Sequence, residues 1–190
     1  LLSVALVAGT TAFKWSQCPT DDKRINVNTL EVTPNPVTVP GDLKIKILGD
    51  ILKGADNVDV ELTIYKKMFF WIKLPCLNLA GYPIPIGSCR YNDGCKLMKE
   101  LPRLDDTGMV QQVMDQIFKS NPALKDCPFT PTKVTIDSIN LDLKHIKIPP
   151  IIPGGIVNGL YKIRITVYDH KTQTKTGCVE FEVNLKLNNK

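Results

Sequence analysis

The stretches YKIRITV, residues 161–167, and VEFEVNLKL, residues 179–187, decide the fold class of this chain. In both stretches apolar and polar side chains alternate with a period of two, which gives a strand one apolar face and one solvated face. Residues 43–47 and 58–64 repeat the alternation. One solvated face is typical of strands in antiparallel sheets. The pattern therefore predicts an all-β protein in which two antiparallel sheets face each other.

Two interruptions of the alternation have a structural interpretation. The run 134–143 changes phase between Ile136 and Ile139, and a β-bulge at that point would restore the register. Prolines surround residues 37–39 on both sides. Because proline is tolerated mainly at the edge of a sheet, these residues are predicted to form a short edge strand.

A single segment shows helical spacing in place of alternation. One amphipathic helix is expected over residues 107–119, with Asp106 or Thr107 as its N-cap and Asn121 after its end. Its Met-rich apolar stripe favours packing against a sheet over contact with a ligand, because methionine fills irregular gaps in cores. The stripe consists of Met109, Val110, Val113, Met114, Ile117 and Phe118.

Length and composition predict one globular domain. The 190 residues are 43% apolar and 23% charged, as in folded chains. We expect residues 1–12, LLSVALVAGTTA, to be the end of a secretory signal peptide, with a buried first strand as the alternative. The domain would then comprise residues 13–190. The net charge of +5 is spread over scattered lysines, which argues against nucleic acid and favours approach to anionic membranes.

The cysteine content points to the secretory pathway. Six cysteines are an even number suited to disulfides in an oxidising compartment, and they allow fifteen pairings that spacing cannot distinguish. A zinc site is disfavoured because there is no Cys-x-x-Cys pair and because His145 and His170 lack the spacing of metal ligands. Neither a metal nor a cofactor is expected.

The sequence lacks the common catalytic motifs. It has no Gly-x-Ser-x-Gly, no phosphate-binding glycine loop and no dinucleotide fingerprint. Asp105 and Asp106 resemble a catalytic carboxylate pair, but capping of the following helix explains them better. His145 is expected to face solvent, and His170 is expected in a hairpin turn. A secreted hydrolase that uses one of these histidines is the weaker alternative.

The most unusual segment is KKMFFWIKLPC, residues 66–76, followed by LNLAGYPIPIGSC, residues 77–89. Proline and glycine interrupt the apolar residues between Cys76 and Cys89, so this loop should run over the surface. Exposed apolar loops beside lysines mark surfaces that meet membranes. The alternative is that the aromatic residues form the core of a closed sandwich. The candidate membrane-facing residues are Phe69, Phe70, Trp71, Ile72, Tyr82, Ile84 and Ile86.

Short motifs occur in an order that resembles a known family. They are WSQC (15–18), PNP (34–36), VPG (39–41), WIKLPC (71–76), GSC (87–89), CPF (127–129), GLYKI (159–163) and GC (177–178). Over nearly all of residues 13–190 the chain resembles the ganglioside GM2 activators of the ML lipid-recognition superfamily. The resemblance implies a β-cup whose two sheets stand apart around an apolar lipid cavity. The disulfides that it implies are Cys18–Cys178, Cys76–Cys89 and Cys95–Cys127.

The resemblance also implies a function that is not enzymatic. Such a protein extracts a glycosphingolipid or phospholipid from a membrane that it touches transiently, and presents it to a soluble lysosomal glycosidase of the β-hexosaminidase type. The expected location is the lysosomal lumen or the extracellular space. A secreted lipid carrier or defence protein with no hydrolase partner is the alternative. The family's second rim loop corresponds here to IPPIIPGGIV, residues 148–157, which adds Ile151 and Ile152 to the candidate rim.

Overall fold

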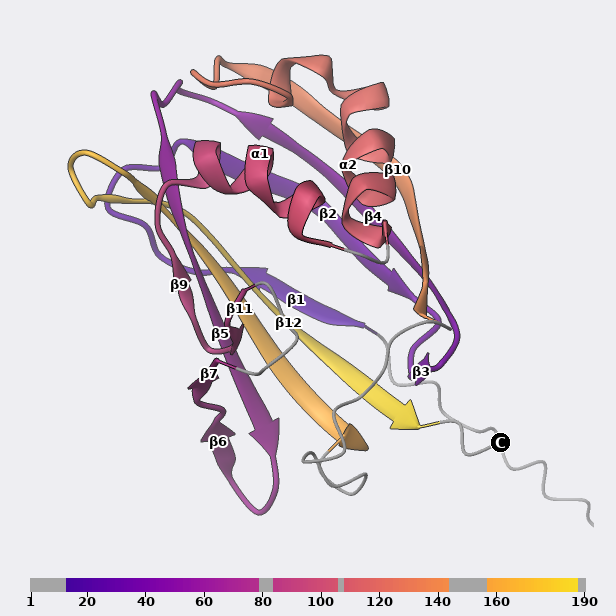
Figure 1. The fold of residues 1–190 in the computed structure, drawn as a ribbon. Helices are drawn as coiled ribbons and strands as arrows, with labels where there is room; N and C mark the ends of the chain where they lie inside the picture. Colours follow the sequence, from indigo (N-terminus) through magenta and orange to yellow (C-terminus); the bar gives the residue numbers. More distant parts are fainter. Residues whose placement is uncertain (1–12, 79–83, 106–107, 144–156, 188–190) are drawn as a thin grey trace, which may run out of the picture.

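The computed structural model describes residues 13–78, 84–105, 108–143 and 157–187. The expectations for residues 1–12, Tyr82, His145, Ile151 and Ile152 lie outside these ranges. Within them the chain forms two main sheets, antiparallel except for one short pairing, and a separate two-stranded pair (Figure 1). The predicted all-β class with facing sheets is confirmed.

The larger sheet has seven strands and contains both stretches that predicted it. Its main path runs β1-β12-β11-β5-β6, while β3 pairs in parallel with β12 and β9 pairs with β5. Tyr161 lies opposite Val183 and Ile163 lies opposite Phe181, so the apolar side chains of β11 and β12 share one face. The strands are β1 Lys14–Gln17, β3 Val37–Val39, β5 Val58–Lys67, β6 Trp71–Lys73, β9 Arg90–Tyr91, β11 Gly159–Asp169 and β12 Lys175–Leu187.

The smaller sheet has the order β10-β4-β2. The predicted bulge is confirmed, because the register of β10 against β4 shifts between Ile136 and Ile139. The predicted short edge strand is confirmed as β3. The strands are β2 Ile25–Thr33, β4 Asp42–Ile51 and β10 Thr132–Asp142, and a separate pair is formed by β7 Cys76–Leu77 and β8 Ile86–Gly87.

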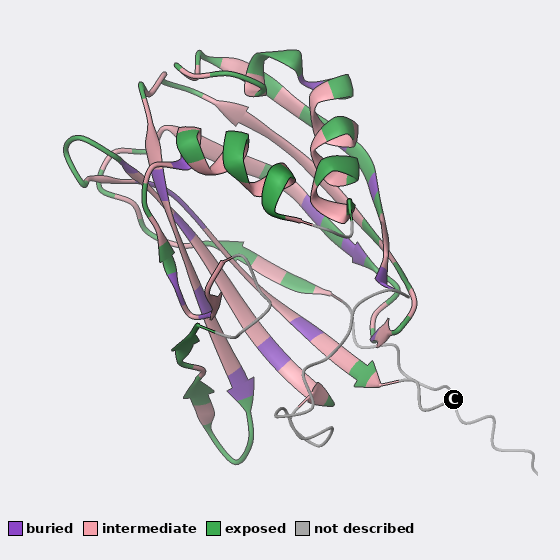
Figure 2. Cartoon of the chain, viewed as in Figure 1, coloured by how far each residue is buried: buried purple, intermediate pink, exposed green. Residues whose placement is uncertain are grey.

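The two sheets share a buried core at one end of the molecule. The core cluster consists of Val32, Val37, Leu143, Tyr161 and Val183, contributed by both sheets. At the opposite end, α1 contacts β5 of the larger sheet and α2 contacts β10 of the smaller sheet. Figure 2 shows that these helices have almost no buried residues, in contrast to the strands.

Helix α2, Met109–Ser120, confirms the helix expected over residues 107–119. The expected N-cap, Asp106 or Thr107, is wrong: the N-cap is Gly108, whose φ of 70° is a conformation that glycine adopts without strain. The Asp105 carboxylate accepts a hydrogen bond of 2.6 Å from the Val110 N–H, which confirms a capping role for Asp105. A 3₁₀ turn, η1 Pro122–Leu124, follows α2.

Helix α1, Gly94–Leu104, was absent from the sequence-based expectation. Pro102 lies inside it, and proline usually ends a helix. Leu97, Leu101 and Leu104 recur at helical spacing and are the signal from which α1 could have been predicted. The Asp93 carboxylate begins the helix by accepting a hydrogen bond of 3.0 Å from the Lys96 N–H.

Three disulfides join the cysteines in the pairs that the resemblance implied, Cys18–Cys178, Cys76–Cys89 and Cys95–Cys127. The first joins β1 to β12 across a sequence separation of 160 residues. Closing a loop of this length contributes about 5 kcal/mol in the chain-entropy model. The third ties the first turn of α1 to the segment that precedes β10.

Two side-chain amides cover the free edge of β10. Asn121 donates to the Thr135 carbonyl at 2.9 Å and accepts from the Thr135 N–H at 2.8 Å. Gln116 pairs in the same way with the backbone of Asn140, at 3.2 and 2.9 Å. Each amide takes the place of one residue of a neighbouring strand, so the edge is protected and α2 is aligned along β10.

We expect Asn121→Ala to lower the free energy of unfolding by about 1–2 kcal/mol, because Asn121 is buried and its replacement removes both bonds to Thr135. Urea denaturation of the wild type and the variant measures the difference. Gln112→Ala, an exposed change on α2, is the matched control and should change stability by less than about 0.5 kcal/mol. Equal losses for the two variants would contradict the edge-covering role.

Candidate functional site

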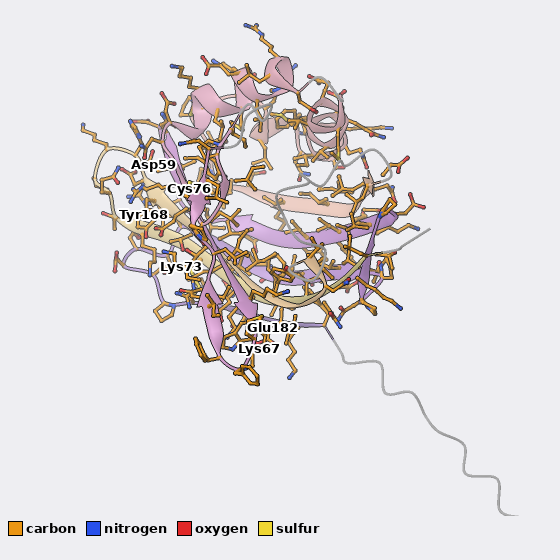
Figure 3. The ribbon with its side chains drawn as sticks, turned by 60° about the horizontal axis from the view of Figure 1, so that its bottom comes forward. Asp59, Lys67, Lys73, Cys76, Tyr168 and Glu182 are labelled. Carbon is orange, nitrogen blue, oxygen red and sulfur yellow. A yellow bond between two sulfur atoms is a disulfide. The ribbon has the colours of Figure 1, made fainter. Side chains whose placement is uncertain are left out.

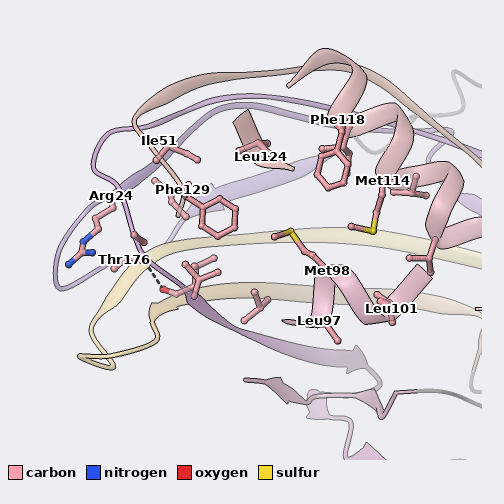
Figure 4. A pocket seen from close by; sticks show the side chains of 18 of the residues that line it. Arg24, Ile51, Leu97, Met98, Leu101, Met114, Phe118, Leu124, Phe129 and Thr176 are labelled. Carbon is pink, nitrogen blue, oxygen red and sulfur yellow. Dashed lines mark hydrogen bonds between the residues drawn. The ribbon is translucent and has the colours of Figure 1, made fainter. Parts of the chain in front are cut away.

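A cavity of about 660 Å³ lies between α1, α2 and the ends of both sheets (Figure 4). Its volume is within the range of about 300–1,000 Å³ typical of small-molecule sites. The strands and their connections contribute Arg24, Ile25, Ile51, Lys53, Ala55, Val58, Val60, Phe129, Leu141, Val167 and Thr176. The helical segment contributes Leu97, Met98, Leu101, Met109, Val110, Val113, Met114, Ile117, Phe118 and Leu124.

The cavity is hollow because α1 and α2 contact the sheets without filling the space between them with side chains. None of the residues in α2 is buried, and Gly94 is the one buried residue of α1. The interpretation of the α2 stripe as core packing holds only in part: Met109 packs against the core cluster and α2 contacts β10, but all six residues of the stripe also line the cavity. Methionine and leucine at helical spacing give the same sequence pattern for a packed core and for a lined cavity, so periodicity alone could not separate them.

The polar groups at the cavity wall are bonded to other parts of the protein. The Thr176 hydroxyl donates to the Val167 carbonyl at 3.2 Å (Figure 4). Arg24 forms ion pairs with Asp22 at 2.8 Å and with Asp169 at 2.9 Å, and its guanidinium points away from the cavity. The Lys53 ammonium, on an exposed side chain, also binds Asp22, at 2.8 Å. The wall therefore presents hydrocarbon to whatever enters.

The β5–β6 hairpin presents three apolar side chains to solvent at its tip, which we call the apolar tip. Met68 is 57% exposed, Phe69 98% and Phe70 67%. These exposures exclude the alternative in which the phenylalanine pair belongs to a packed core. Ile72 is also exposed. The apolar tip therefore remains a candidate contact surface.

Trp71 does not share the exposure of the apolar tip. Its ring is half-buried, with the Lys162 ammonium 4.6 Å and the Lys67 ammonium 5.2 Å from its centroid. Figure 3 shows Lys67 and Lys73 beside this hairpin. Contact between ammonium groups and an indole face is favourable, so Trp71 stabilises the end of the hairpin next to the apolar tip, where it pairs with Lys67.

The structure separates the predicted rim from the cavity. Ile84 and Ile86 are half-buried near the Cys76–Cys89 disulfide, and no described rim candidate lines the cavity. The apolar tip follows the Lys67 end of β5, whereas Val58 and Val60 line the cavity at its other end. A strand of ten residues is about 30 Å long. The two features therefore lie roughly one strand length apart.

Comparison with protein families matches residues 12–185 to the ML domain. This chain belongs to the ML domain family. Two relatives of the ML domain are ganglioside GM2 activators, from Macaca fascicularis and Mus musculus. Each is 23% identical to this chain and covers 92% of it, over 177 and 181 residues, which are 84% and 82% of the respective relatives.

Among solved structures, a Niemann-Pick type C2 protein from the Japanese carpenter ant matches this ML domain with a TM-score of 0.44 and 9% identity. The match covers 92% of this chain and 100% of that protein. Within the described parts of the ML domain, no helix is long and apolar enough to span a bilayer. The same residues hold no group of three or more His, Cys, Asp or Glu side chains suited to a metal ion.

A buried carboxylate anchors α1 to the larger sheet of the ML domain. Asp59 is 2% exposed and accepts hydrogen bonds from four donors. They are the Asp93 N–H at 3.0 Å, His170 Nδ1 at 2.6 Å, Gln173 Nε2 at 2.9 Å and Arg90 at 3.2 Å. Asp93 is the N-cap of α1, so the Asp59 cluster links this helix to the β11–β12 turn that contains His170. Figure 3 shows Asp59 near Tyr168 on this face.

The charges in the Asp59 cluster shift the pKa values of its members in opposite directions. Burial raises the pKa of Asp59, but the hydrogen bonds from Gln173, His170, Asp93 and Arg90 outweigh it and hold this pKa well below its usual range. The hydrogen bond to Asp59 raises the pKa of His170 above its usual value, and Asp93 and Asp169 add to the effect. The expectation that His170 lies in a hairpin turn is confirmed, and its structural partner is Asp59.

The raised pKa of His170 predicts greater stability in mild acid. Below about pH 6.5, the value in an unfolded chain, the histidine is charged in both states and its bond to Asp59 contributes fully. As the pH rises through the higher folded pKa, the proton leaves and this contribution is lost. We therefore expect the free energy of unfolding to fall between about pH 6 and pH 8, where histidine titrates.

Denaturant unfolding at several pH values measures this dependence. His170→Gln retains a side-chain N–H but has no charge to lose, so its stability should change less over the same interval. Identical pH profiles for the wild type and His170→Gln would contradict the role of the His170–Asp59 pair.

Proposed function

We propose that this ML domain protein binds the hydrocarbon part of a lipid in the α1–α2 cavity and moves the lipid between membranes. The observation that supports the proposal is the cavity itself, which has an apolar wall and about 660 Å³ of space. An unpaired polar group transferred there would lose its hydrogen bonds to water at a cost of roughly 2–7 kcal/mol. A buried methylene group is instead stabilised by about 0.8 kcal/mol.

The free energy of burying methylene groups also explains why lipid transfer needs a protein. A lipid with roughly 30 methylene groups would be destabilised by over 20 kcal/mol if all of them entered water. A carrier removes most of this barrier by offering an apolar space equivalent to the membrane interior. The cavity wall provides such a space, because its polar groups at Arg24, Lys53 and Thr176 are bonded elsewhere.

The apolar tip is the part of the chain best suited to touch a membrane. Phe69 and Phe70 project from the hairpin, and the exposed side chains of Lys67 and Lys73 lie near them. Aromatic side chains enter the headgroup region, while each lysine near an anionic surface contributes about 1 kcal/mol. The exposed Ile72 would add to this contact surface, while Trp71, Ile84 and Ile86 are half-buried and would contribute less of their area. The protein would thus bind membranes peripherally and transiently.

In its finer form, the function is that of a non-enzymatic activator of glycolipid breakdown. The protein would present a glycosphingolipid to a soluble lysosomal glycosidase of the β-hexosaminidase type. Two relatives named as ganglioside GM2 activators support this form, as do three disulfides, which suit the secretory pathway and the lysosomal lumen. The alternative is an extracellular lipid carrier with no hydrolase partner. Lipid transfer without faster glycolipid hydrolysis would favour that alternative.

We expect Leu101→Trp to lower lipid uptake about tenfold, because the larger side chain occupies cavity space and displacing it costs about 1–3 kcal/mol. Transfer of a fluorescent glycolipid between vesicles measures uptake. Leu104→Trp introduces the same side chain one turn further along α1, at an exposed position outside the cavity, and is the matched control. If folded wild-type protein moves no lipid above the protein-free rate, the proposed function is wrong.

We expect Phe69→Ala to lower the affinity for anionic vesicles about tenfold, since burial of one phenylalanine stabilises by about 1.5–3 kcal/mol. Vesicle flotation measures binding. Leu52→Ala removes another exposed apolar side chain, 49% exposed and directly after β4, and serves as the control. Phe69→Ala should leave uptake from detergent-dispersed lipid unchanged, because Phe69 does not line the cavity. Loss of uptake with intact vesicle binding would reverse the roles assigned to tip and cavity.

A further inference from the structure

The two walls of the cavity differ in stiffness. We infer that the helical wall lets the cavity accept aliphatic chains of different shape, so that the ligand class is lipids whose tails vary in bends and branches. The inference rests on the proposed lipid binding, and it concerns which tails are accepted once a lipid enters.

The strand wall is stiff. Five of its positions are β-branched aliphatic residues in regular strands, Ile25, Ile51, Val58, Val60 and Val167. A β-branched side chain has few χ1 rotamers available. The backbone of each strand is held by ladders to its neighbours, as in the pairing of β5 with β11 and of β2 with β4. This wall therefore keeps its shape when a ligand enters.

The helical wall contains the β-branched Val110, Val113 and Ile117, but it also carries the flexible side chains of the cavity. Of the four methionines in the chain, Met98, Met109 and Met114 line the cavity. Figure 4 shows Met98 and Met114 pointing into the cavity from α1 and α2. Methionine is unbranched, has three rotatable side-chain bonds and adapts to irregular surfaces. Surfaces rich in methionine accept varied partners because they can repack.

The backbone behind the helical wall is also free of a second packed layer. The outer face of α1 consists of exposed residues, among them Lys96, Lys99 and Arg103. The first turn of α1 is attached to the sheets, through the Cys95–Cys127 disulfide and the bond from Asp93 to Asp59. The other end of α1 is attached to α2, through the bond from the Val110 N–H to the C-cap Asp105. The C-terminal half of α1 can therefore shift with its side chains, because no buried residue of that half would be uncovered.

These features favour flexible acyl or alkyl chains over a rigid ring system. A rigid ligand is selected by walls that match one fixed outline on every side. Here one side is fixed and the other adjusts, so a straight, a cis-bent and a methyl-branched chain can each be surrounded.

The test uses the full chain and an equimolar mixture of phosphatidylcholines in vesicles. The three lipids share a headgroup and a carbon number, and carry saturated, cis-unsaturated or methyl-branched tails. Native mass spectrometry reads the proportion of protein bound to each. The wild type should bind the three within about threefold of one another. Met98→Ile combined with Met114→Ile should favour one shape by about tenfold, since stiff pockets discriminate single methyl groups at this level.

Leu104→Ile introduces the same β-branching on α1 outside the cavity and should keep the wild-type proportions. Thermal denaturation confirms that each variant is folded. Single substitutions, Met98→Ile or Met114→Ile, replace the double variant if it does not fold. The inference is overturned if the wild type already prefers one tail more than tenfold, or if folded methionine variants keep its proportions. A wild type that takes up none of the lipids refutes the proposed function as well, which separates the two failures.

Discussion

The apolar faces of the two sheets must be covered, and at one end of the molecule they cover each other. There Val32, Val37, Leu143, Tyr161 and Val183 are buried in a common cluster. At the other end the same faces continue, but α1 and α2 lie against the sheets and leave a space that their side chains do not fill. A sandwich packed along its whole length would have no such space. The division between a closed end and an open end is what makes a ligand site available on this fold.

Hydrogen bonds and a disulfide hold the open end together, where side-chain packing cannot. Gln116 and Asn121 attach α2 to the backbone of β10, and the Asp59 cluster attaches the start of α1 to the larger sheet. The Cys95–Cys127 disulfide connects the two attachments. Each device acts on backbone or on charged groups and leaves the apolar sides of the helices facing the cavity. Hydrogen bonds and the disulfide thus fix the position of the helices, while their apolar side chains remain available to line the cavity.

The sequence contained enough information for the sheets but not for the site. Alternation between Tyr161 and Val167 predicts a strand because period two has one structural meaning in a half-solvated sheet. The phase change between Ile136 and Ile139 likewise located the bulge. The stripe from Met109 to Phe118 predicted a helix correctly, but the pattern says only that these side chains avoid water. Whether they avoid it by packing or by lining a cavity depends on the distance between sheets, which no local pattern encodes.

For the apolar tip, the sequence predicted exposure but not the position of the tip relative to the cavity. The concentration of apolar residues beside lysines predicted an exposed apolar surface, and Phe69 is exposed. The Pro- and Gly-rich loop that follows has Ile84 and Ile86 half-buried. The distance of the tip from the cavity depends on where the helices stand relative to β5, and α1 was missing from the prediction because Pro102 interrupts it. Trp71 has the side chain of a membrane anchor, yet its ring is half-buried and contacts the ammonium groups of Lys67 and Lys162.

An unfilled interior also links folding to cargo. Side chains around a void lack the dispersion contacts that a filled interior would supply. The protein with an empty cavity is therefore less stable than the same protein with the cavity filled. A ligand that binds the native state and not the unfolded state stabilises the protein. At concentrations well above its dissociation constant, the gain grows with the logarithm of the ratio of concentration to dissociation constant. The melting temperature should therefore depend on what a preparation has encountered. Protein refolded in a lipid-free buffer would then differ in stability from the same protein isolated from a cell with bound lipid.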